Sequence, residues 1–395
     1  MISRAPLRHI RYLLLGALFA YLPFSAWLVS ITGNDAFSLV RDILVAGIVV
    51  TSLVIYQLEA RPTASRAMVL LAILAGWMAL SYMWREASPD QWVRGLRFLL
   101  LPLAVLGSLH IAPLTQPEWR ALRGIVLLGL GVILFAALLE IIGYPVPMYV
   151  DPSVSGALIE THQVGMINIA RLQAILAGPN ALGLYLLAAL GWIIAEGKAS
   201  RWLIIAGCIV LVLTYSRSSI LGLLLFTALS YGIWVSHQKR RAPYIIIGAL
   251  LAIATVVSGI SVYQKPELRD LITHYDSSSQ RVEQYQRIWD TRSEIGLWGR
   301  GAGTAGPASQ YRRDGGPNRW TENSYLDFYE EYGLVGLVLF LTVLITLTIR
   351  TWKSAPYAAV AVISFLVAGL FLNFGTGQVG LFLSMAFLGQ YSRRS

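Results

Sequence analysis

Charged residues are scarce in this sequence, and cysteine and histidine are scarcer still. Only 13% of the 395 residues are charged, while 56% are hydrophobic. The single cysteine, Cys208, excludes a disulfide within this chain. The five histidines lack the spacing of metal ligands and no Asp-x-Asp motif occurs, so nothing supports a metal-dependent site for a nucleotide sugar. This composition excludes an ordinary soluble domain and favours a membrane protein.

Long apolar runs fill most of the chain. Many of them are about 17 to 22 residues long, which is the length that a helix needs to cross the bilayer core. We therefore predict an all-α, polytopic integral membrane protein with about twelve transmembrane helices, in which residues 1–395 form a single membrane domain. The predicted spans are a first run ending near Ile31, then 38–56, 68–83, 93–112, 124–142, 179–195, 202–215, 218–236, 243–262, 333–349, 356–373 and 376–391. Between 202 and 236 the only break is Ser216-Arg217-Ser218-Ser219, where we predict a tight reversal.

The basic residues of the short loops predict the orientation of these spans. With the N-terminus inside, every cytoplasmic segment carries Lys or Arg, as the positive-inside rule requires. Both termini are thus predicted to be cytoplasmic, and the first run is predicted to be a retained span because it lacks a clear cleavage site. Two extracytoplasmic loops are long, 143–178 and 263–332, the second between spans nine and ten. Loops of this length usually carry function or are disordered.

Arginine dominates the basic residues on the predicted outer side. The net charge of +10 does not indicate a nucleic-acid partner, because the basic residues are dispersed rather than gathered on a soluble domain. Guanidinium forks match phosphate oxygens in pairs, which lysine cannot do. The alternative is that these arginines pair with loop acids or reach the lipid headgroups. Arg41, Arg94, Arg97 and Arg217 stand near span ends, where a charge is costly and usually functional.

Four short motifs on this side carry a resemblance to a known family. They are Gly178-Pro-Asn-Ala-Leu-Gly preceded by Arg171; Thr214-Tyr-Ser-Arg-Ser-Ser; Arg287-Ile-Trp followed by Gly299-Arg-Gly-Ala-Gly-Thr; and Glu322-Asn-Ser-Tyr-Leu followed by Gly333-Leu-Val-Gly. In this order, from about 165 to 350, they resemble the O-antigen ligase and O-antigen polymerase superfamily. Each motif alone is weak, but the four together on one side are fairly specific.

The resemblance implies an enzyme of the bacterial inner membrane. It would be a metal-independent type-C glycosyltransferase without a cofactor, acting at the periplasmic face on an undecaprenyl-diphosphate-linked glycan. The acceptor would be a second glycan for a polymerase, or lipid A core for a ligase. Ligases of this family have a histidine before the Asn-Ser-Tyr-Leu-like helix, whereas Glu322 stands there in this chain. That difference favours a polymerase of O-antigen, exopolysaccharide or capsule repeats.

The chemistry assigns roles to the motif residues. Transfer from a lipid diphosphate needs cations on the leaving diphosphate and a base for the attacking hydroxyl. The candidate catalytic residues are therefore Glu322 as base with Arg217 and Arg287, and the candidate substrate-binding residues are Arg171, Asn180, Arg281, Arg97, Asn323, Tyr325 and Asp327. Capping of the following helix by Asn323 is an equally good reading of that residue. Asp327, Glu330 and Leu334 share a helical face with Asn323, where pairing with arginine is more plausible than direct catalysis for the acids.

Two other readings of the sequence stay open or are set aside. Gly301-x-Gly-x-x-Gly306 matches a dinucleotide fingerprint, but no βαβ unit surrounds it, so we expect a glycine loop that approaches the glycan closely. A transporter or flippase for the same lipid-linked substrate would need polar groups at the membrane midplane, and few occur here.

Overall fold

A computed structural model describes residues 4–32, 36–59, 65–144, 161–164, 167–196, 201–237, 275–311, 319–374 and 378–393. The described chain is helical apart from one hairpin. The longer helices are α1 Arg4–Tyr21, α3 Ala36–Leu58, α4 Arg66–Leu80, α5 Pro89–Ile111, α6 Gln116–Ile141, α7 Pro179–Glu196, α8 Arg201–Leu213, α9 Arg217–His237, α12 Tyr275–Asp290, α14 Ser324–Ser354, α15 Pro356–Ala368 and α16 Gln378–Tyr391. Shorter helices are η1 Leu22–Phe24, α2 Ser25–Thr32, η2 Ser81–Trp84, α13 Arg292–Ile295 and η3 Gly306–Tyr311.

The predicted spans coincide with helices wherever the structure describes them. Within the described residues, six helices are long and apolar enough to cross a membrane: Ala5–Thr32, Ala36–Leu58, Arg66–Trp84, Pro89–Ile111, Gln116–Ile141 and Ser324–Ser354. Shorter apolar helices occupy Pro179–Ala195, Arg201–Leu213, Arg217–Ile233 and Pro356–Ala368. The chain is therefore a multi-pass membrane protein. The predicted span 243–262 lies outside the described residues, so the number of twelve stays a prediction.

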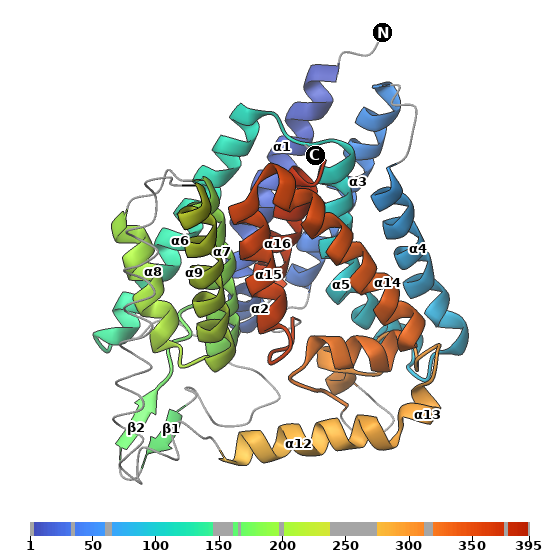
Figure 1. Cartoon of the computed structure of the whole chain (residues 1–395), viewed down its shortest axis with the longest axis vertical. Coiled ribbons are helices and arrows are strands. Elements are labelled where there is room, and N and C mark those ends of the chain that lie inside the picture. Colours follow the sequence, from blue (N-terminus) through green and yellow to red (C-terminus); the bar gives the residue numbers. More distant parts are fainter. Residues whose placement is uncertain are drawn as a thin grey trace.

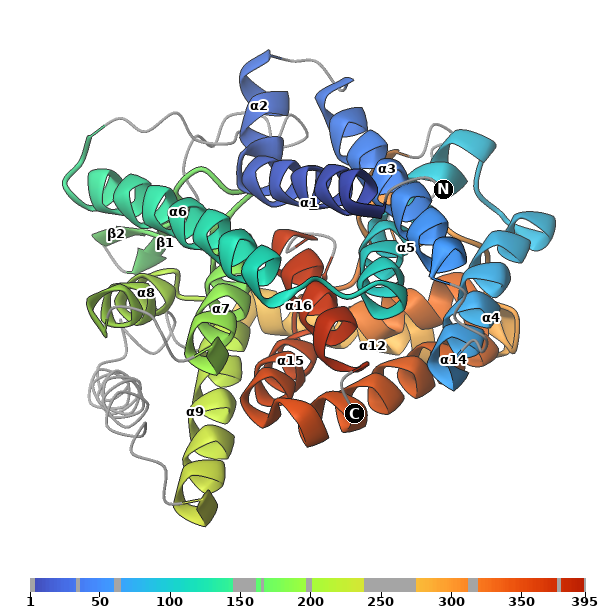
Figure 2. The same cartoon turned by 90° about the horizontal axis from the view of Figure 1, so that it is seen from above.

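Helix α16 lies in the middle of the bundle, with α5, α7, α14 and α15 around it (Figure 2). Glycine permits the close approach of these helices. A Cβ at Gly389 of α16 would lie 2.5 Å from the Leu106 carbonyl oxygen of α5, and a Cβ at Gly380 would lie 2.8 Å from the Leu184 carbonyl oxygen of α7. Because real Cβ atoms do not come this near, the two glycines set the distances around α16.

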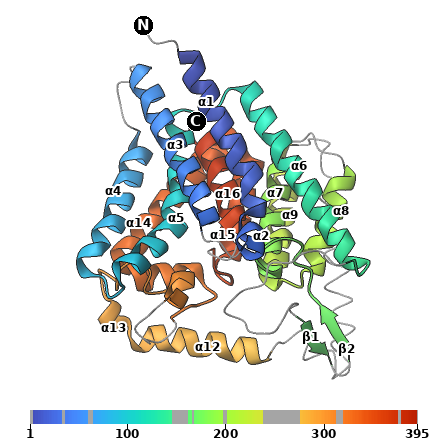
Figure 3. The same ribbon diagram turned by 180° about the vertical axis from the view of Figure 1, so that it is seen from behind.

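The two ends of the bundle differ. The start of α1 and the end of α16 lie at one end, whereas α12 runs across the opposite end (Figures 1 and 3). The end that carries α12 also carries the turn between α8 and α9 and the start of α14. This arrangement agrees with the predicted alternation of the spans. We call the end that carries α12 the α12 end, and the end that carries the start of α1 and the end of α16 the terminal end.

Regular structure occurs inside both predicted loops. Strands β1 Thr161–Val164 and β2 Ile167–Ala170 pair in antiparallel register, with His162 opposite Ile169, within the predicted loop 143–178. The prediction of an all-α chain is thus wrong for this one hairpin. Helix α12 lies within the predicted loop 263–332, where α13 and η3 follow it. Val282, Tyr285 and Trp289 recur in α12 at spacings of three and four, a helical signal from which no helix was predicted.

The Gly-rich loop between α13 and η3 is buried inside the protein. Gly299, Gly301, Gly303 and Gly306 all have positive φ angles, between 62° and 91°. Residues 301–306 are buried, and the Gly303 carbonyl oxygen accepts a 2.6 Å hydrogen bond from the Gln91 side chain of α5. The close approach that glycine permits here is to the protein's own backbone, which corrects the expectation that this loop approaches the glycan.

Two glycines from separate motifs meet at the bend of α14. Gly333 has φ 69° and ψ −173°, so the helix is interrupted there. A Cβ on Gly299 would lie 2.4 Å from the Gly333 nitrogen, and one on Gly333 would lie 2.2 Å from the Leu297 carbonyl oxygen. The motifs Gly299-Arg-Gly and Gly333-Leu-Val-Gly are therefore two sides of one tight backbone contact, which fixes the first segment of α14.

We predict that Gly95→Ala will destabilise the protein and displace the Gly-rich loop. A Cβ at Gly95 of α5 would lie 2.2 Å from the Gly303 backbone nitrogen, and neither backbone can move away freely. Overpacking of this kind costs about 1–3 kcal/mol. Gly107→Ala on the same helix is the matched control, because nothing lies within 4 Å of its Cβ position. Thermal unfolding in detergent should show a lower midpoint for the first variant only; equal midpoints would refute this packing.

Candidate functional site

Arg171 lies just before α7 in a segment that three helices hold in place. The Glu140 carboxylate at the end of α6 accepts the Ala174 backbone N–H at 2.8 Å. The Arg171 guanidinium donates to the Thr214 carbonyl oxygen and to Asn180 Oδ1, each at 3.0 Å. Arg171 is 9% exposed. The structure thus joins Arg171 and Asn180 to the turn that follows α8.

The predicted reversal at 216–219 occurs, and it places Arg217 at the first position of α9. Helix α8 ends at Leu213, and Tyr215 turns the chain with a φ of 52°. Helices α7 and α9 pack closely beside this turn, because a Cβ at Gly183 would lie 2.5 Å from Ser219 Oγ. The glycine of the Gly-Pro-Asn-Ala-Leu-Gly motif therefore fixes the position of Arg217. Pro179 begins α7, where proline suits the first turn.

Helix α12 brings Arg281 to Glu322. The Arg281 Nε lies 2.6 Å from Glu322 Oε2, and a second nitrogen of the guanidinium also donates to this oxygen. The Glu322 backbone N–H donates to Gln284 Oε1 at 3.3 Å. Arg281, Gln284 and Ile288 lie on the less exposed face of α12, whereas Val282 on the other face is 53% exposed. The contacts of α12 with the start of α14 are therefore mainly polar.

Four of the candidate site residues, three of them from the sequence motifs, gather at the α12 end. Arg217 interacts electrostatically with Arg281, Glu322 and Arg171. We call Arg171, Arg217, Arg281 and Glu322 the arginine cluster. Its members come from the segment before α7, the start of α9, α12 and the start of α14, so residues separated by 151 positions meet in space. Three of the four sequence motifs converge here as predicted.

Arg287 belongs to a second group of charges beside the first. Its guanidinium donates to Glu330 Oε2 of α14 at 3.0 Å, and the Glu330 side chain is 2% exposed. The predicted pairing of the α14 acids with arginine is thus confirmed for Glu330. Arg319 lies 3.7 Å from Glu330 and 2.7 Å from Glu86, which also accepts from Arg300 at 3.0 Å.

Glu86 joins this second group to the connection between α4 and α5. Burial favours a raised pKa for the Glu86 carboxyl, but the Arg319 and Arg300 guanidiniums outweigh burial and hold that pKa below its usual value. Arg300 in turn donates to Glu294 at 2.6 Å. Glu86 therefore stays ionised at neutral pH. Through Arg300 and Arg319 it holds the Gly-rich loop and the segment before α14.

Arg97 is not part of the arginine cluster. It pairs with Asp42 of α3 at 2.5 Å and lies 3.4 Å from the Ser38 carbonyl oxygen. Arg41 lies beside it, at 3.3 Å from the same Asp42 carboxylate. None of these contacts of Arg97 is with another candidate residue, so they do not support its predicted role in substrate binding.

The residues that open α14 have structural contacts. Asn323 is the N-cap of the helix, and its Oδ1 accepts the Tyr325 and Leu326 backbone N–H groups at 3.0 and 3.2 Å. The capping alternative is therefore confirmed. The Tyr325 hydroxyl donates to the Leu366 carbonyl oxygen of α15 at 2.7 Å, and its ring packs near Phe374. Tyr325 points into the bundle rather than into the arginine cluster.

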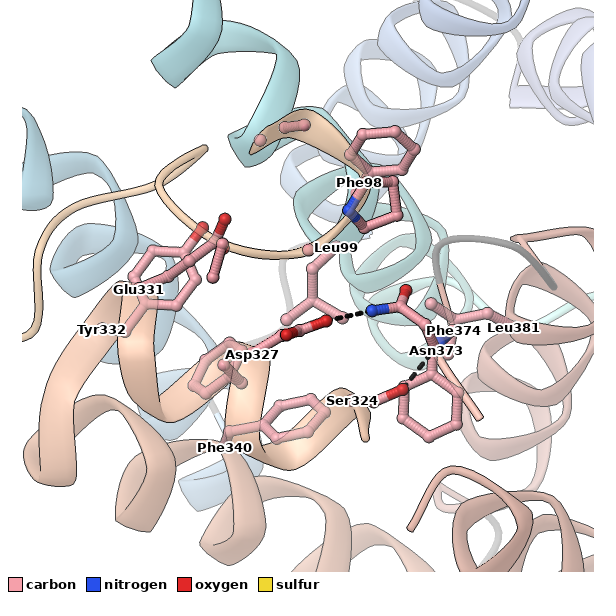
Figure 4. A pocket seen from close by; sticks show the side chains of 16 residues that line it. Phe98, Leu99, Ser324, Asp327, Glu331, Tyr332, Phe340, Asn373, Phe374 and Leu381 are labelled. Carbon is pink, nitrogen blue, oxygen red and sulfur yellow. Dashed lines mark hydrogen bonds between the residues drawn. The ribbon is translucent and has the colours of Figure 1, made fainter. Parts of the chain in front are cut away.

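Asp327 is buried beside a small cavity. Its Oδ1 accepts from the Thr321 hydroxyl at 2.7 Å and from the Thr321 backbone N–H at 3.0 Å. Its Oδ2 accepts from Asn373 (Figure 4). The cavity holds about 60 Å³ and its lining includes Phe98, Phe328 and Phe340, so it is too small for a glycan. The interruption at Gly333 also removes Leu334 from the helical face that it was predicted to share with Asp327.

The residues that position the arginine cluster and the second group of charges were not predicted from the sequence. Glu140, Gln284, Glu86 and Arg319 make the contacts described above, but none belongs to a motif. For the two glutamates, the available signal was the excess of arginines near the span ends, because a charge at such a position requires a partner. Within the described ranges, no group of three or more His, Cys, Asp or Glu residues could hold a metal ion.

Comparison with known proteins agrees with the motifs. No curated protein matches the chain. Residues 202–341 match the family model described as O-antigen ligase, and this range includes Arg217, Arg281, Arg287 and Glu322. The match and the motifs agree: residues 202–341 are similar to the O-antigen ligase family, and the motifs resemble the O-antigen ligase and polymerase superfamily.

Proposed function

We propose that the chain is an inner-membrane glycosyltransferase that acts on an undecaprenyl-diphosphate-linked glycan at the periplasmic face. The observation that carries this proposal is the arginine cluster at the α12 end, in which Arg281 pairs with Glu322 and Arg217 interacts electrostatically with Arg281, Glu322 and Arg171. Like charges repel each other strongly near a membrane, so such a group is expected where an anion binds. A diphosphate is the anion that the family's substrates supply.

Arg217 and Arg281 are the proposed ligands of the diphosphate. Arg217 is exposed and Arg281 is half-buried, so both can reach a ligand. Arg171 is buried and already donates to Thr214 and Asn180, so its proposed role is to add positive charge and to hold the turn before α9. Arg287 was predicted to bind diphosphate as well. Its contact with Glu330 supports a role in positioning α12 and therefore Arg281.

Glu322 is the proposed general base. In this structure its carboxylate is occupied by Arg281. A diphosphate that binds Arg281 would compete for the guanidinium and release the carboxylate towards the acceptor hydroxyl. The acceptor oxygen then forms a bond to the anomeric carbon while the bond from that carbon to the diphosphate oxygen breaks. The proton passes to Glu322, and undecaprenyl diphosphate leaves with its negative charge on the arginines.

The proposed product is a longer lipid-linked glycan. Glu322 in place of the ligase histidine favours polymerisation of O-antigen, exopolysaccharide or capsule repeats. Transfer to lipid A core is the second candidate, supported by the O-antigen ligase description of the matching family model. Transport across the bilayer is less well supported, because the charged groups gather at one end of the bundle rather than at its middle.

A deletion strain should distinguish the two candidates. For a polymerase, we expect a single repeat on lipid A core, or the loss of long capsule chains, because the repeats cannot be joined. For a ligase, long chains should accumulate on undecaprenyl while the core stays bare. Gel profiles and mass spectrometry of lipid A and of undecaprenyl-linked glycans measure this. A normal profile of both would exclude both candidates.

Arg217→Lys should lower activity even though it keeps the charge. Lysine cannot make the paired contact with phosphate oxygens. A hydrogen bond to a charged group contributes about 1.5–3 kcal/mol, so kcat/KM should fall by about 10- to 100-fold. Arg94→Lys is the matched control, because Arg94 is an α5 residue that pairs with Asp90 instead. Activity of the purified protein on lipid-linked donor measures the effect, and an unchanged kcat/KM for Arg217→Lys would contradict bidentate binding.

Glu322→Gln should lower kcat by about 10²- to 10⁴-fold, the usual contribution of a general base. The KM for the donor should fall, because glutamine keeps the size of the side chain but competes less with the diphosphate for Arg281. Glu330→Gln is the comparison: it breaks the contact with Arg287 and should lower thermal stability with a smaller effect on kcat. If Glu330→Gln lowers kcat as much as Glu322→Gln does, the base is not Glu322.

A further inference from the structure

A basic cavity lies at the terminal end of the bundle, away from the arginine cluster. It has a volume of about 390 Å³. Its lining consists of Tyr56, Ser65, Met68, His110, Ile111, Arg350, Lys353, Ser392 and Arg393. These residues come from the end of α3, the start of α4, and the ends of α5, α14 and α16. Five apolar helices therefore open onto one polar space at the same end.

The charges of this cavity are of one sign. Arg350, Lys353 and Arg393 line it, and no acidic residue is among the described residues that line it. Other cations at this end have protein partners: Arg8 pairs with Glu59, and Arg11 donates to the Ala112 carbonyl oxygen. No ion pair with a described residue is found for Arg350 or Lys353. Three cations around one cavity repel each other unless an anion lies between them.

Hydrogen bonds between residues of separate helices hold the wall of the cavity in place. His110 is 2% exposed, and its two ring nitrogens lie 2.8 Å from Ser65 Oγ and 2.8 Å from Ser392 Oγ. Arg393 donates to the Ile111 carbonyl oxygen at the end of α5. These contacts fasten the segment after α16 to α4 and α5. They hold Arg393 opposite the last turns of α14, which carry Arg350 and Lys353.

We propose that this cavity binds the phosphate of an anionic phospholipid headgroup. A guanidinium fork and a mobile ammonium together suit a phosphate group, which has several acceptor oxygens. The cavity opens where the apolar helices end, at the level of the headgroups, and basic pockets between transmembrane helices are known headgroup sites. Tyr56 adds an aromatic side chain of the kind found at membrane interfaces. The competing explanation is that the cations only complement the carbonyl ends of α5 and α14.

The test is the thermal stability of the full chain in neutral detergent as phosphatidylglycerol is added. The wild type should show a rise in the unfolding midpoint that saturates. The double variant Arg350→Gln, Lys353→Gln should need about 30-fold more lipid for the same shift, since each cation contributes about a factor of five. The double variant Arg120→Gln, Arg123→Gln is the matched control: it removes the same charge at the same end, but neither residue lines the cavity.

Three outcomes decide the proposal. Loss of the shift in the cavity variant but not in the control supports it. An equal shift with inorganic phosphate would keep the phosphate site but overturn the lipid as its ligand. Equal weakening in both double variants, or no shift in the wild type, would overturn the site. If the double variant is already unstable without lipid, the single variant Lys353→Gln serves instead and should need about five-fold more lipid for the same shift.

Discussion

The ion pair between Arg281 and Glu322 is the contact on which the candidate site depends. It joins a polar helix, α12, to the start of α14, and the neighbouring pair of Arg287 with Glu330 joins them a second time. The Arg281–Glu322 pair is partly exposed and contributes about 1 kcal/mol or less, whereas Glu330 of the second pair is buried. Charge rather than apolar area therefore holds α12 across the end of the bundle. A helix held in this way can exchange its carboxylate partners for a substrate phosphate at little cost, which a helix packed through a large apolar face could not do.

The charge balance of the site fits this exchange. Arg171, Arg217 and Arg281 carry three positive charges against the one negative charge of Glu322, so these four described residues have a positive surplus. A diphosphate diester carries about two negative charges and would neutralise that surplus. Glu330 is different, because Arg287 and Arg319 already balance its charge and its side chain is buried in the second turn of α14. The buried acid keeps the scaffold in place, and the accessible acid is the one that a substrate can uncover.

Most elements that depend on hydrophobic periodicity or on a local backbone signal could be predicted from the sequence. Apolar runs predicted the spans, and Ser216-Arg217 marked the reversal between α8 and α9 because a polar break in a long apolar stretch requires a turn. The partners of the arginines could not be predicted in this way. Glu140, Glu86 and Gln284 reach the site from distant parts of the chain, and their pairing depends on tertiary packing. Asn323 was ambiguous for a physical reason: an amide that can bind a sugar can also cap a helix, and here the free N–H groups of α14 take it.

The glutamate at the position of the ligase histidine changes what the site needs around it. A neutral imidazole can stand beside a diphosphate without repulsion, whereas a carboxylate cannot. A chain with Glu322 therefore requires an extra cation at that place, and Arg281 supplies it from α12. In the proposed mechanism the carboxylate and the arginine act together: Arg281 shields Glu322 until the diphosphate arrives, and the diphosphate then removes that shield. Such a site would keep its base occupied whenever the donor is absent, and would make the two halves of the reaction, donor binding and acceptor activation, depend on the same guanidinium.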